Sequence, residues 1–121
     1  MSTTEPFLNV ELVNLSGVKF DDSNVNSARE QYEPGLAGWQ VNLETNKDGQ
    51  WTAVGSQYTA ADGSYSFPGL WPGTYRVNES MQDGWRQTLA PESVSTISGD
   101  VIAGMDFGNV KLGSVTVAKW D

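Results

Sequence analysis

Apolar and polar residues alternate along short stretches of this chain. Trp39, Val41 and Leu43, for example, are separated by polar residues, and turn signals such as Asp62-Gly63 follow at close intervals. Alternation with a period of two is typical of a β-strand with one buried face, and no stretch repeats apolar residues at the helical period. The sequence therefore predicts an all-β, antiparallel sandwich, with strands near 15–21, 38–45, 51–58, 64–67, 74–80, 85–88, 93–98, 101–109 and 111–119.

Three polar residues alternate in step with apolar ones, so their side chains are expected to point into the core. Lys19 is an even number of positions from Leu15, and Glu79 is an even number of positions from Tyr75, so each lies on the same strand face as that apolar residue. Burying an unpaired charge costs several kcal/mol, so these residues are expected to pair or to react with one another. Asn109 is the third, and it ends an expected apolar face of Val101, Ala103, Met105 and Phe107.

Composition and charge narrow the range of functions. The chain has 121 residues, enough for one domain, and a formal net charge of −8. We expect no binding to nucleic acid or to anionic membranes, because both need a basic surface, whereas divalent cations suit an acidic one. The absence of cysteine and histidine excludes Cys–His and Ser–His nucleophiles and nearly all zinc sites. No apolar run has the length of a membrane span, and a monomer is expected.

The chain contains two copies of one segment. "FLNVELVNLSGVKFD" (7–21) aligns without a gap on "FGNVKLGSVTVAKWD" (107–121), at an offset of 100 residues. We therefore expect the tail of a preceding repeat at 1–14, one sandwich module at 15–112, and the first strand of a following repeat at 113–121. The alternative is two similar edge strands. The identical pairs are Phe7/Phe107, Asn9/Asn109, Val10/Val110, Leu12/Leu112, Lys19/Lys119 and Asp21/Asp121.

Several motifs occur in one consistent order over residues 15–112. They are "KFDD", "EPGLAGW", "DGSYSF", "PGTYRV" and "DFGN". This series resembles the B-type repeats of serine-aspartate repeat (Sdr) surface proteins, which are relatives of the collagen-adhesin (Cna) B-type domains of bacterial or archaeal surface proteins. The resemblance implies a prealbumin-like, Ig-like sandwich and a secreted stalk module at the cell surface or cell wall. It also implies calcium in the first loop of some members and a self-formed Lys–Asn isopeptide bond in many.

The loop after the first strand has the ligand spacing of an EF-hand. Counted from Asp22, the coordinating positions fall on oxygen donors, and the twelfth position is a glutamate, the usual bidentate ligand. Ser27 stands where an EF-hand has its glycine, and Val25 where the resembled family commonly has one. The sequence predicts a Ca²⁺ site of weak affinity, and the alternative is a solvated acidic loop. The expected ligands are Asp22, Asn24, Asn26, the carbonyl of Ala28, Glu30 and Glu33.

The three inward polar residues carry the groups that an isopeptide bond needs. A desolvated lysine loses its charge and becomes nucleophilic, and a buried carboxylic acid polarises the amide and moves protons. We expect Lys19 to be joined to Asn109 with Glu79 as the catalytic acid, and these positions match the triad that the resemblance implies. Asp106 is the rival acceptor and is expected to face outward. The alternative is a Lys19–Glu79 salt bridge, with Asn109 in a turn hydrogen bond.

Three functions remain open from the sequence. The first is a structural stalk module that contacts neighbouring repeats of the same chain. The second is an adhesin module that binds a host matrix protein or a glycan. Trp71 and Trp85, expected to be half exposed beside turns, are candidates for that contact, whereas Trp39 is expected in the core. The third is a prealbumin-type accessory domain of an enzyme. Turnover catalysis is not expected, because the carboxylates lack an evident cleft.

Overall fold

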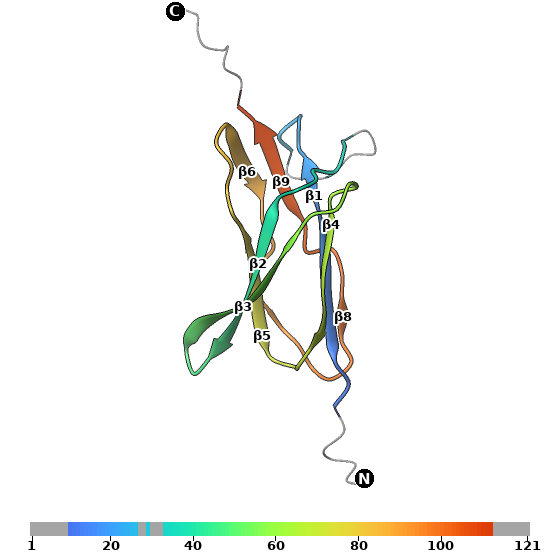
Figure 1. Cartoon of the computed structure of the whole chain (residues 1–121), viewed down its shortest axis with the longest axis vertical. Helices are drawn as coiled ribbons and strands as arrows, with labels where there is room; N and C mark the ends of the chain where they lie inside the picture. The colour runs from blue at the N-terminus through green and yellow to red at the C-terminus, as the bar shows by residue number, and fades with distance from the viewer. Residues whose placement is uncertain (1–9, 27–28, 30–32, 113–121) are drawn as a thin grey trace, which may run out of the picture.

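The computed structural model describes residues 10–26, 29 and 33–112. Within them the chain is an all-β sandwich, as the alternation predicts, and no described residue lies in a helix (Figure 1). None of the described residues belongs to a helix that is long and apolar enough to cross a membrane. The strands are β1 (Val13–Asp21), β2 (Gln40–Lys47), β3 (Gln50–Tyr58), β4 (Ser64–Leu70), β5 (Thr74–Glu79), β6 (Trp85–Leu89), β7 (Val94–Ser95), β8 (Val101–Ile102) and β9 (Phe107–Lys111).

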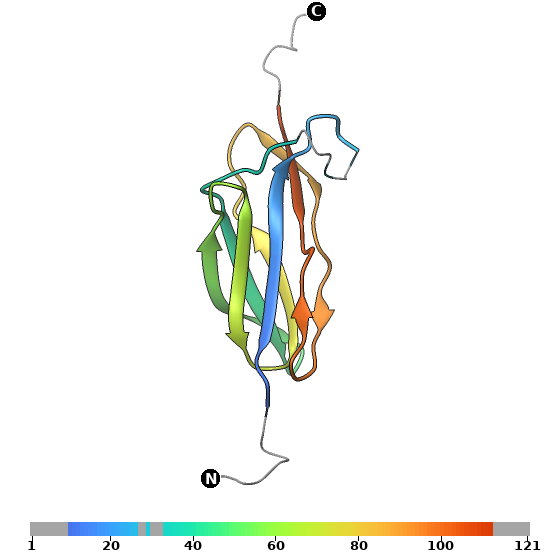
Figure 2. The ribbon, with the colours of Figure 1, turned by 90° about the vertical axis from the view of Figure 1, so that its right-hand side faces the viewer.

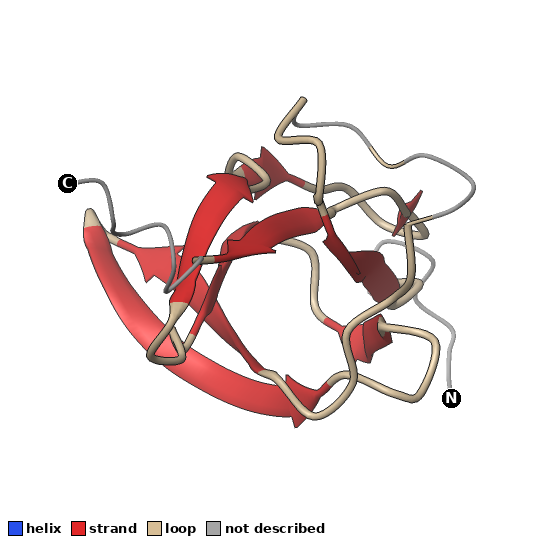
Figure 3. Cartoon of the chain, turned by 90° about the horizontal axis from the view of Figure 1, so that it is seen from above, coloured by secondary structure: helices blue, strands red, loops and turns tan. Residues whose placement is uncertain are grey.

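Two sheets face each other across the core. One has the order β4-β1-β9-β6, with β8 also paired to β1, and the other has the order β3-β2-β5-β7. Neighbours pair antiparallel except that β1 runs parallel to both β8 and β9. Figure 3, a view from above, shows the strands of both sheets around a common interior.

The core is built from the inward residues of the alternating strands. Trp39, Val41 and Leu43 are buried, as predicted. Tyr65 donates a hydrogen bond from its buried hydroxyl to the carbonyl of Met105, and burial raises the pKa of this phenol. The main apolar cluster consists of Val13, Leu15, Val41, Leu43, Tyr65, Phe67, Tyr75, Val77, Met105 and Phe107.

One predicted strand is wrong in its extent. The stretch 101–109 forms two short strands, β8 and β9, separated by residues 103–106. Gly104 has φ +79°, a conformation outside the β region, so the alternation of side chains is interrupted there. Val101 and Ala103 are consequently exposed, whereas Met105 is buried. The predicted strand 93–98 is likewise reduced to β7, and most of the predicted strand 111–119 lies outside the described residues.

The molecule is elongated, and its described part begins at one pole and ends at the opposite pole (Figures 1 and 2). The blue strand β1 begins near the lower pole, and the red strand β9 ends near the upper pole. The two strands are hydrogen-bonded neighbours in one sheet. A force applied to the two ends would therefore act along β1 and β9.

Candidate cross-link site and acidic loop

Lys19 lies on β1, which is flanked by β4 on one side and β9 on the other. Its side chain is completely buried. Its backbone is fixed as well, because its N–H donates to the carbonyl of Gly63 and its carbonyl accepts from Leu36, each at 2.8 Å. Burial lowers the pKa of the Lys19 amine through desolvation, and the adjacent Glu79 opposes that effect. The structure thus favours the neutral, nucleophilic form of this lysine relative to one in water.

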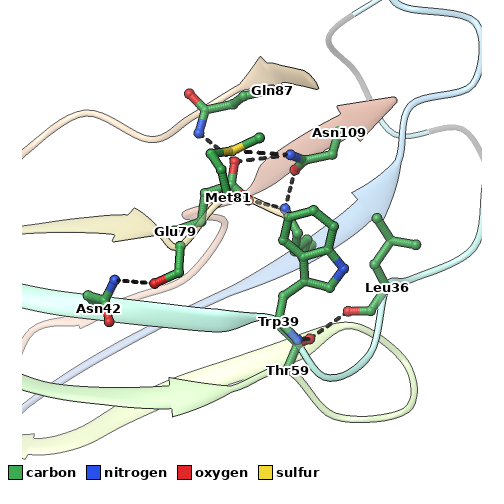
Figure 4. Close-up of polar contacts among 10 residues, drawn as sticks. Leu36, Trp39, Asn42, Thr59, Glu79, Met81, Gln87 and Asn109 are labelled. Carbon is green, nitrogen blue, oxygen red and sulfur yellow. Dashed lines mark hydrogen bonds and ion pairs between the residues drawn. The ribbon is translucent and has the colours of Figure 1, made fainter. Parts of the chain in front are cut away.

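Lys19, Glu79 and Asn109 form a closed set of contacts. Lys19 Nζ donates to Glu79 Oε1 and to Asn109 Oδ1. Asn109 Nδ2 donates to the other carboxylate oxygen, Glu79 Oε2, at 3.1 Å. One glutamate therefore contacts both nitrogens that an isopeptide reaction would exchange. Figure 4 shows Glu79 and Asn109 turned toward each other.

The strand register explains why these side chains meet. In the parallel pair of β1 and β9, Lys19 is opposite Phe107 and Asp21 is opposite Asn109. Lys19 and Asn109 are therefore diagonal neighbours on the inner face of one sheet. Glu79 arrives from β5 in the facing sheet, where it pairs with Val41. The two reacting groups belong to one sheet and the carboxylate to the other.

Aromatic rings cover the amine. Lys19 Nζ lies 3.8 Å from the centroid of the Trp39 ring and 5.7 Å from that of Phe107. Trp39 packs edge-to-face on Trp85, with ring centroids 5.5 Å apart. These rings separate the amine from bulk water, which is the physical origin of its desolvation. Trp85 is half-buried and belongs to this cover, so it is not a free surface ring.

Gln87 is a member of the site that the sequence did not indicate. Its Nε2 donates to Glu79 Oε2, the oxygen that also accepts from Asn109. Gln87 lies opposite Asn109 in the antiparallel pair of β6 and β9. Only the register between β6 and β9 shows that Gln87 belongs to the site, and this register cannot be read from a single sequence. Its donor orients the carboxylate.

Asp106, the rival acceptor, lies apart from this set. It is half-buried, and its Oδ1 accepts a hydrogen bond from the backbone N–H of Val18 at 2.9 Å. The lysine amine instead contacts Asn109. The structure therefore brings together the three residues that the parity argument selected.

The two ends of the acidic loop are buried next to the cross-link site. Asp22 and Glu33 are both inaccessible to solvent, whereas Asn24 and Asn26 are exposed. The backbone N–H of Asp22 donates to the carbonyl of Asn109 at 2.8 Å, which ties the start of the loop to β9. The predicted ligands at 28 and 30 lie outside the described residues.

Asp21 adds a third carboxylate that the sequence reasoning did not include. Burial raises the pKa of this carboxyl, and the negative charges of Glu33 and Asp22 raise it further. Glu33 and Asp22 thus lie close enough to Asp21 for their charges to repel its carboxylate. Buried carboxylate oxygens are hard ligands, so Asp22 and Glu33 fit the chemistry of calcium. Considering the described residues alone, no three acidic side chains are arranged to hold a metal ion.

Comparison with known proteins agrees with this architecture. Residues 14–115 match the model of the SdrD B-like domain family. The serine-aspartate repeat-containing protein F of Staphylococcus epidermidis (strain ATCC 12228 / FDA PCI 1200) is 33% identical over 79 residues, which are 65% of this chain and 5% of that protein. The serine-aspartate repeat-containing protein D of Staphylococcus aureus (strain Newman) is 30% identical over 88 residues, 73% of this chain and 6% of that protein. This chain thus spans a small fraction of the relatives that it matches.

A solved structure shows the same fold at lower sequence identity. GBS52, the minor pilin of Streptococcus agalactiae, superimposes with a TM-score of 0.58 at 17% identity, over 92% of this chain and 49% of that one. The fold and the family match agree with the motif series at 15–112. The chain belongs to the SdrD B-like domain family.

Proposed function

We propose that this chain is a stalk module of a repeated protein on the bacterial cell surface, stabilised by an isopeptide bond between Lys19 and Asn109. The observation that carries the proposal is the contact set of Lys19, Glu79 and Asn109 in a buried, aromatic-lined site. A Lys–Glu ion pair alone would not require an asparagine in contact with both partners. The family and the pilin-like fold support the structural role.

The contacts permit a balanced reaction. Transfer of one proton from the Lys19 ammonium to Glu79 gives a neutral amine and a neutral acid. Nζ attacks Cγ of Asn109, so that a Cγ–Nζ bond forms and the Cγ–Nδ2 bond breaks. Glu79 takes a proton from Nζ through one oxygen and delivers a proton to Nδ2 through the other, and Nδ2 leaves as ammonia. The carboxylate contacts both nitrogens already, so little rearrangement is needed.

The position of the bond suits a load-bearing module. β1 begins at one pole, and its parallel neighbour β9 ends at the opposite pole. Without a cross-link, tension would shear the hydrogen bonds between them. With a bond between Lys19 and Asn109, the load passes from β1 directly to β9, and residues 20–108 lie outside its path.

Calcium is the second element of the proposal. Asp22 and Glu33 would hold the ion together with Asn24, Asn26, the carbonyl of Ala28 and Glu30. The support is the burial of the two carboxylates and their closeness to Asp21, whose pKa is raised first by burial and then by the negative charges of Glu33 and Asp22. A divalent cation would neutralise that charge and fix the loop against β1 and β9.

Intact mass tests the cross-link directly. We expect the chain to weigh one ammonia less than its sequence, about 17 Da, and to retain the full sequence mass in Lys19→Ala, Asn109→Ala and Glu79→Gln. Lys47→Ala is the matched control, because Lys47 is exposed at the end of β2. This variant should still lose ammonia. Full sequence mass in the unmodified chain would contradict the proposal.

A further inference from the structure

The pole at which β1 begins carries exposed apolar side chains from three segments. Leu12 is 49% exposed, Trp71 is 67% exposed and Ile97 is 71% exposed. They precede β1, follow β4 and follow β7, respectively. Scattered apolar residues on a surface need no explanation, whereas several from one pole suggest a contact. We call these three residues the N-terminal pole.

Hydrogen bonds hold the three segments together. The carbonyl of Glu11 accepts from Gly99 N at 2.9 Å, which joins the start of β1 to the loop after β7. The carbonyl of Gly73 accepts from Thr96 N at 2.9 Å, which joins the turn after β4 to the same loop. The N-terminal pole is therefore one structured surface and not three independent loops.

We propose that the N-terminal pole docks on the opposite, C-terminal pole of the preceding copy of this module in the same chain. This inference rests on the repeated protein of the proposed function. The C-terminal pole offers Leu112 and Met81, exposed by 52% and 50%. Leu112 is tied to this end by a hydrogen bond from its N–H to the carbonyl of Gly84 at 2.7 Å.

The repeat fixes the distance between the two poles. At an offset of 100 residues, Leu12 and Leu112 are equivalent positions. β9 ends at Lys111 and β1 begins at Val13, so a repeated chain has one residue, this leucine, between the last strand of one module and the first strand of the next. One residue spans at most about 3.6 Å. The facing poles of adjacent modules would therefore lie within contact distance of each other.

The leucine itself is consistent with such a junction. The leucine is about half exposed at both equivalent positions, as Leu12 before β1 and as Leu112 after β9. At a junction between two modules, each module would cover the part of this leucine side chain that the other module leaves exposed. β1 and β9 run parallel, so successive modules point the same way and each contact joins unlike poles, head to tail.

Electrostatics favours docking within one chain over docking between chains. The net charge is −8, and self-repulsion opposes association of separate molecules. A direct covalent junction supplies a high effective concentration and overcomes that repulsion. The proposal thus predicts that the single module is monomeric and that its N-terminal pole is covered only in a tandem.

A two-module protein tests the docking. It consists of the chain through Leu112 followed directly by a second copy of residues 13–112, and its comparison has a flexible Gly/Ser insert of about ten residues at the junction. We expect acrylamide to quench Trp71 of the second module about twofold less in the direct fusion, because its ring is covered. Trp71→Phe in that module isolates its signal. Equal quenching in the two proteins would overturn the proposal.

Substitutions separate the contact from folding. Ile97→Ser in the second module should lower the thermal midpoint of the direct fusion to that of the spacer protein and leave the 121-residue chain unchanged. Tyr58→Ser is the matched control, because Tyr58 is 65% exposed on β3 and not part of either pole. Concentration-dependent dimers of the single chain through Trp71 would also overturn the proposal. Intact mass of the same samples reports the cross-link separately, so failure of one proposal is distinguishable from failure of the other.

Discussion

At the residue scale, the site depends on how a buried lysine is kept reactive. An ammonium in the core is costly without a partner, and a strong ion pair would keep it protonated. Here burial lowers the pKa of Lys19 and Glu79 opposes that shift. Gln87 and Asn109 both donate to Glu79 Oε2, so the carboxylate is shared among three donors and does not serve the lysine alone.

The lysine makes a testable prediction about pH in a chain that cannot form the cross-link. In Asn109→Ala the amine stays free, and its pKa in the folded state is below the ordinary lysine value of 10.5. At pH values between the lowered pKa of the folded chain and the ordinary pKa of the unfolded chain, the unfolded chain binds more protons than the folded one. The free energy of unfolding therefore rises with pH in this range. Urea denaturation from pH 7 to about 9.5 should show this rise.

The control for this pH series removes the titrating group. Lys19→Met combined with Asn109→Ala should show no such rise, and neither should the cross-linked chain, whose lysine is an amide. The series stops below pH 10 because burial raises the pKa of Tyr65 and Tyr75, and these phenols reduce stability above their ordinary pKa. A flat profile for Asn109→Ala would contradict the lowered pKa of Lys19.

At the scale of the elements, alternation predicted the inward side chains wherever a strand is regular. Lys19 and Glu79 follow their apolar neighbours into the core because β1 and β5 keep a period of two. Val101 does not follow the predicted alternation, because Gly104 leaves the β conformation and breaks the period. Gln87 and Asp21 could not be assigned, because their roles depend on register and on the approach of distant segments, which no local pattern encodes.

Gly17 shows how closely β1 approaches another segment. A Cβ at this position would overlap the backbone carbonyl of Met105 and crowd the Tyr65 hydroxyl. Gly17→Ala should therefore destabilise the fold by about 1–3 kcal/mol, as measured by urea denaturation. Gly55→Ala, on the exposed strand β3 with open space around it, should change stability by less than about 0.5 kcal/mol. Equal effects would contradict the close packing of β1.

The acidic loop is predicted to respond to calcium. Saturating Ca²⁺ at about 100 times the dissociation constant should stabilise the fold by about 2.7 kcal/mol, and a chelator should remove that gain. Asp22→Asn with Glu33→Gln should abolish the response, because both buried carboxylates are lost. Glu44→Gln, a partner of Arg76 on the other sheet, should leave it intact. A thermal midpoint that is the same with calcium and with chelator would contradict the calcium site.

At the scale of the whole molecule, the elongated shape and the two poles give the module a direction. A pulling force would act on the start of β1 at one pole and on the end of β9 at the other. The proposed bond lies near the upper pole, since Asn109 is close to the end of β9. Most of β1 therefore stays in the load path, where it pairs with β4 between Val13 and Val18 and with β8 at Asn14 and Leu15. The docked poles would carry the same load from one module to the next.

Single-molecule pulling on the two ends of the chain tests this arrangement. The cross-linked module should show no unfolding step from residues 20–108, because the covalent bond transmits the force directly from Lys19 to Asn109. Lys19→Ala should release that segment in one step, with a gain in contour length on the order of 30 nm. Lys47→Ala should behave like the unmodified chain, because its amine lies outside the site. An unfolding step of that length in the unmodified chain would show that β1 and β9 are joined by hydrogen bonds alone.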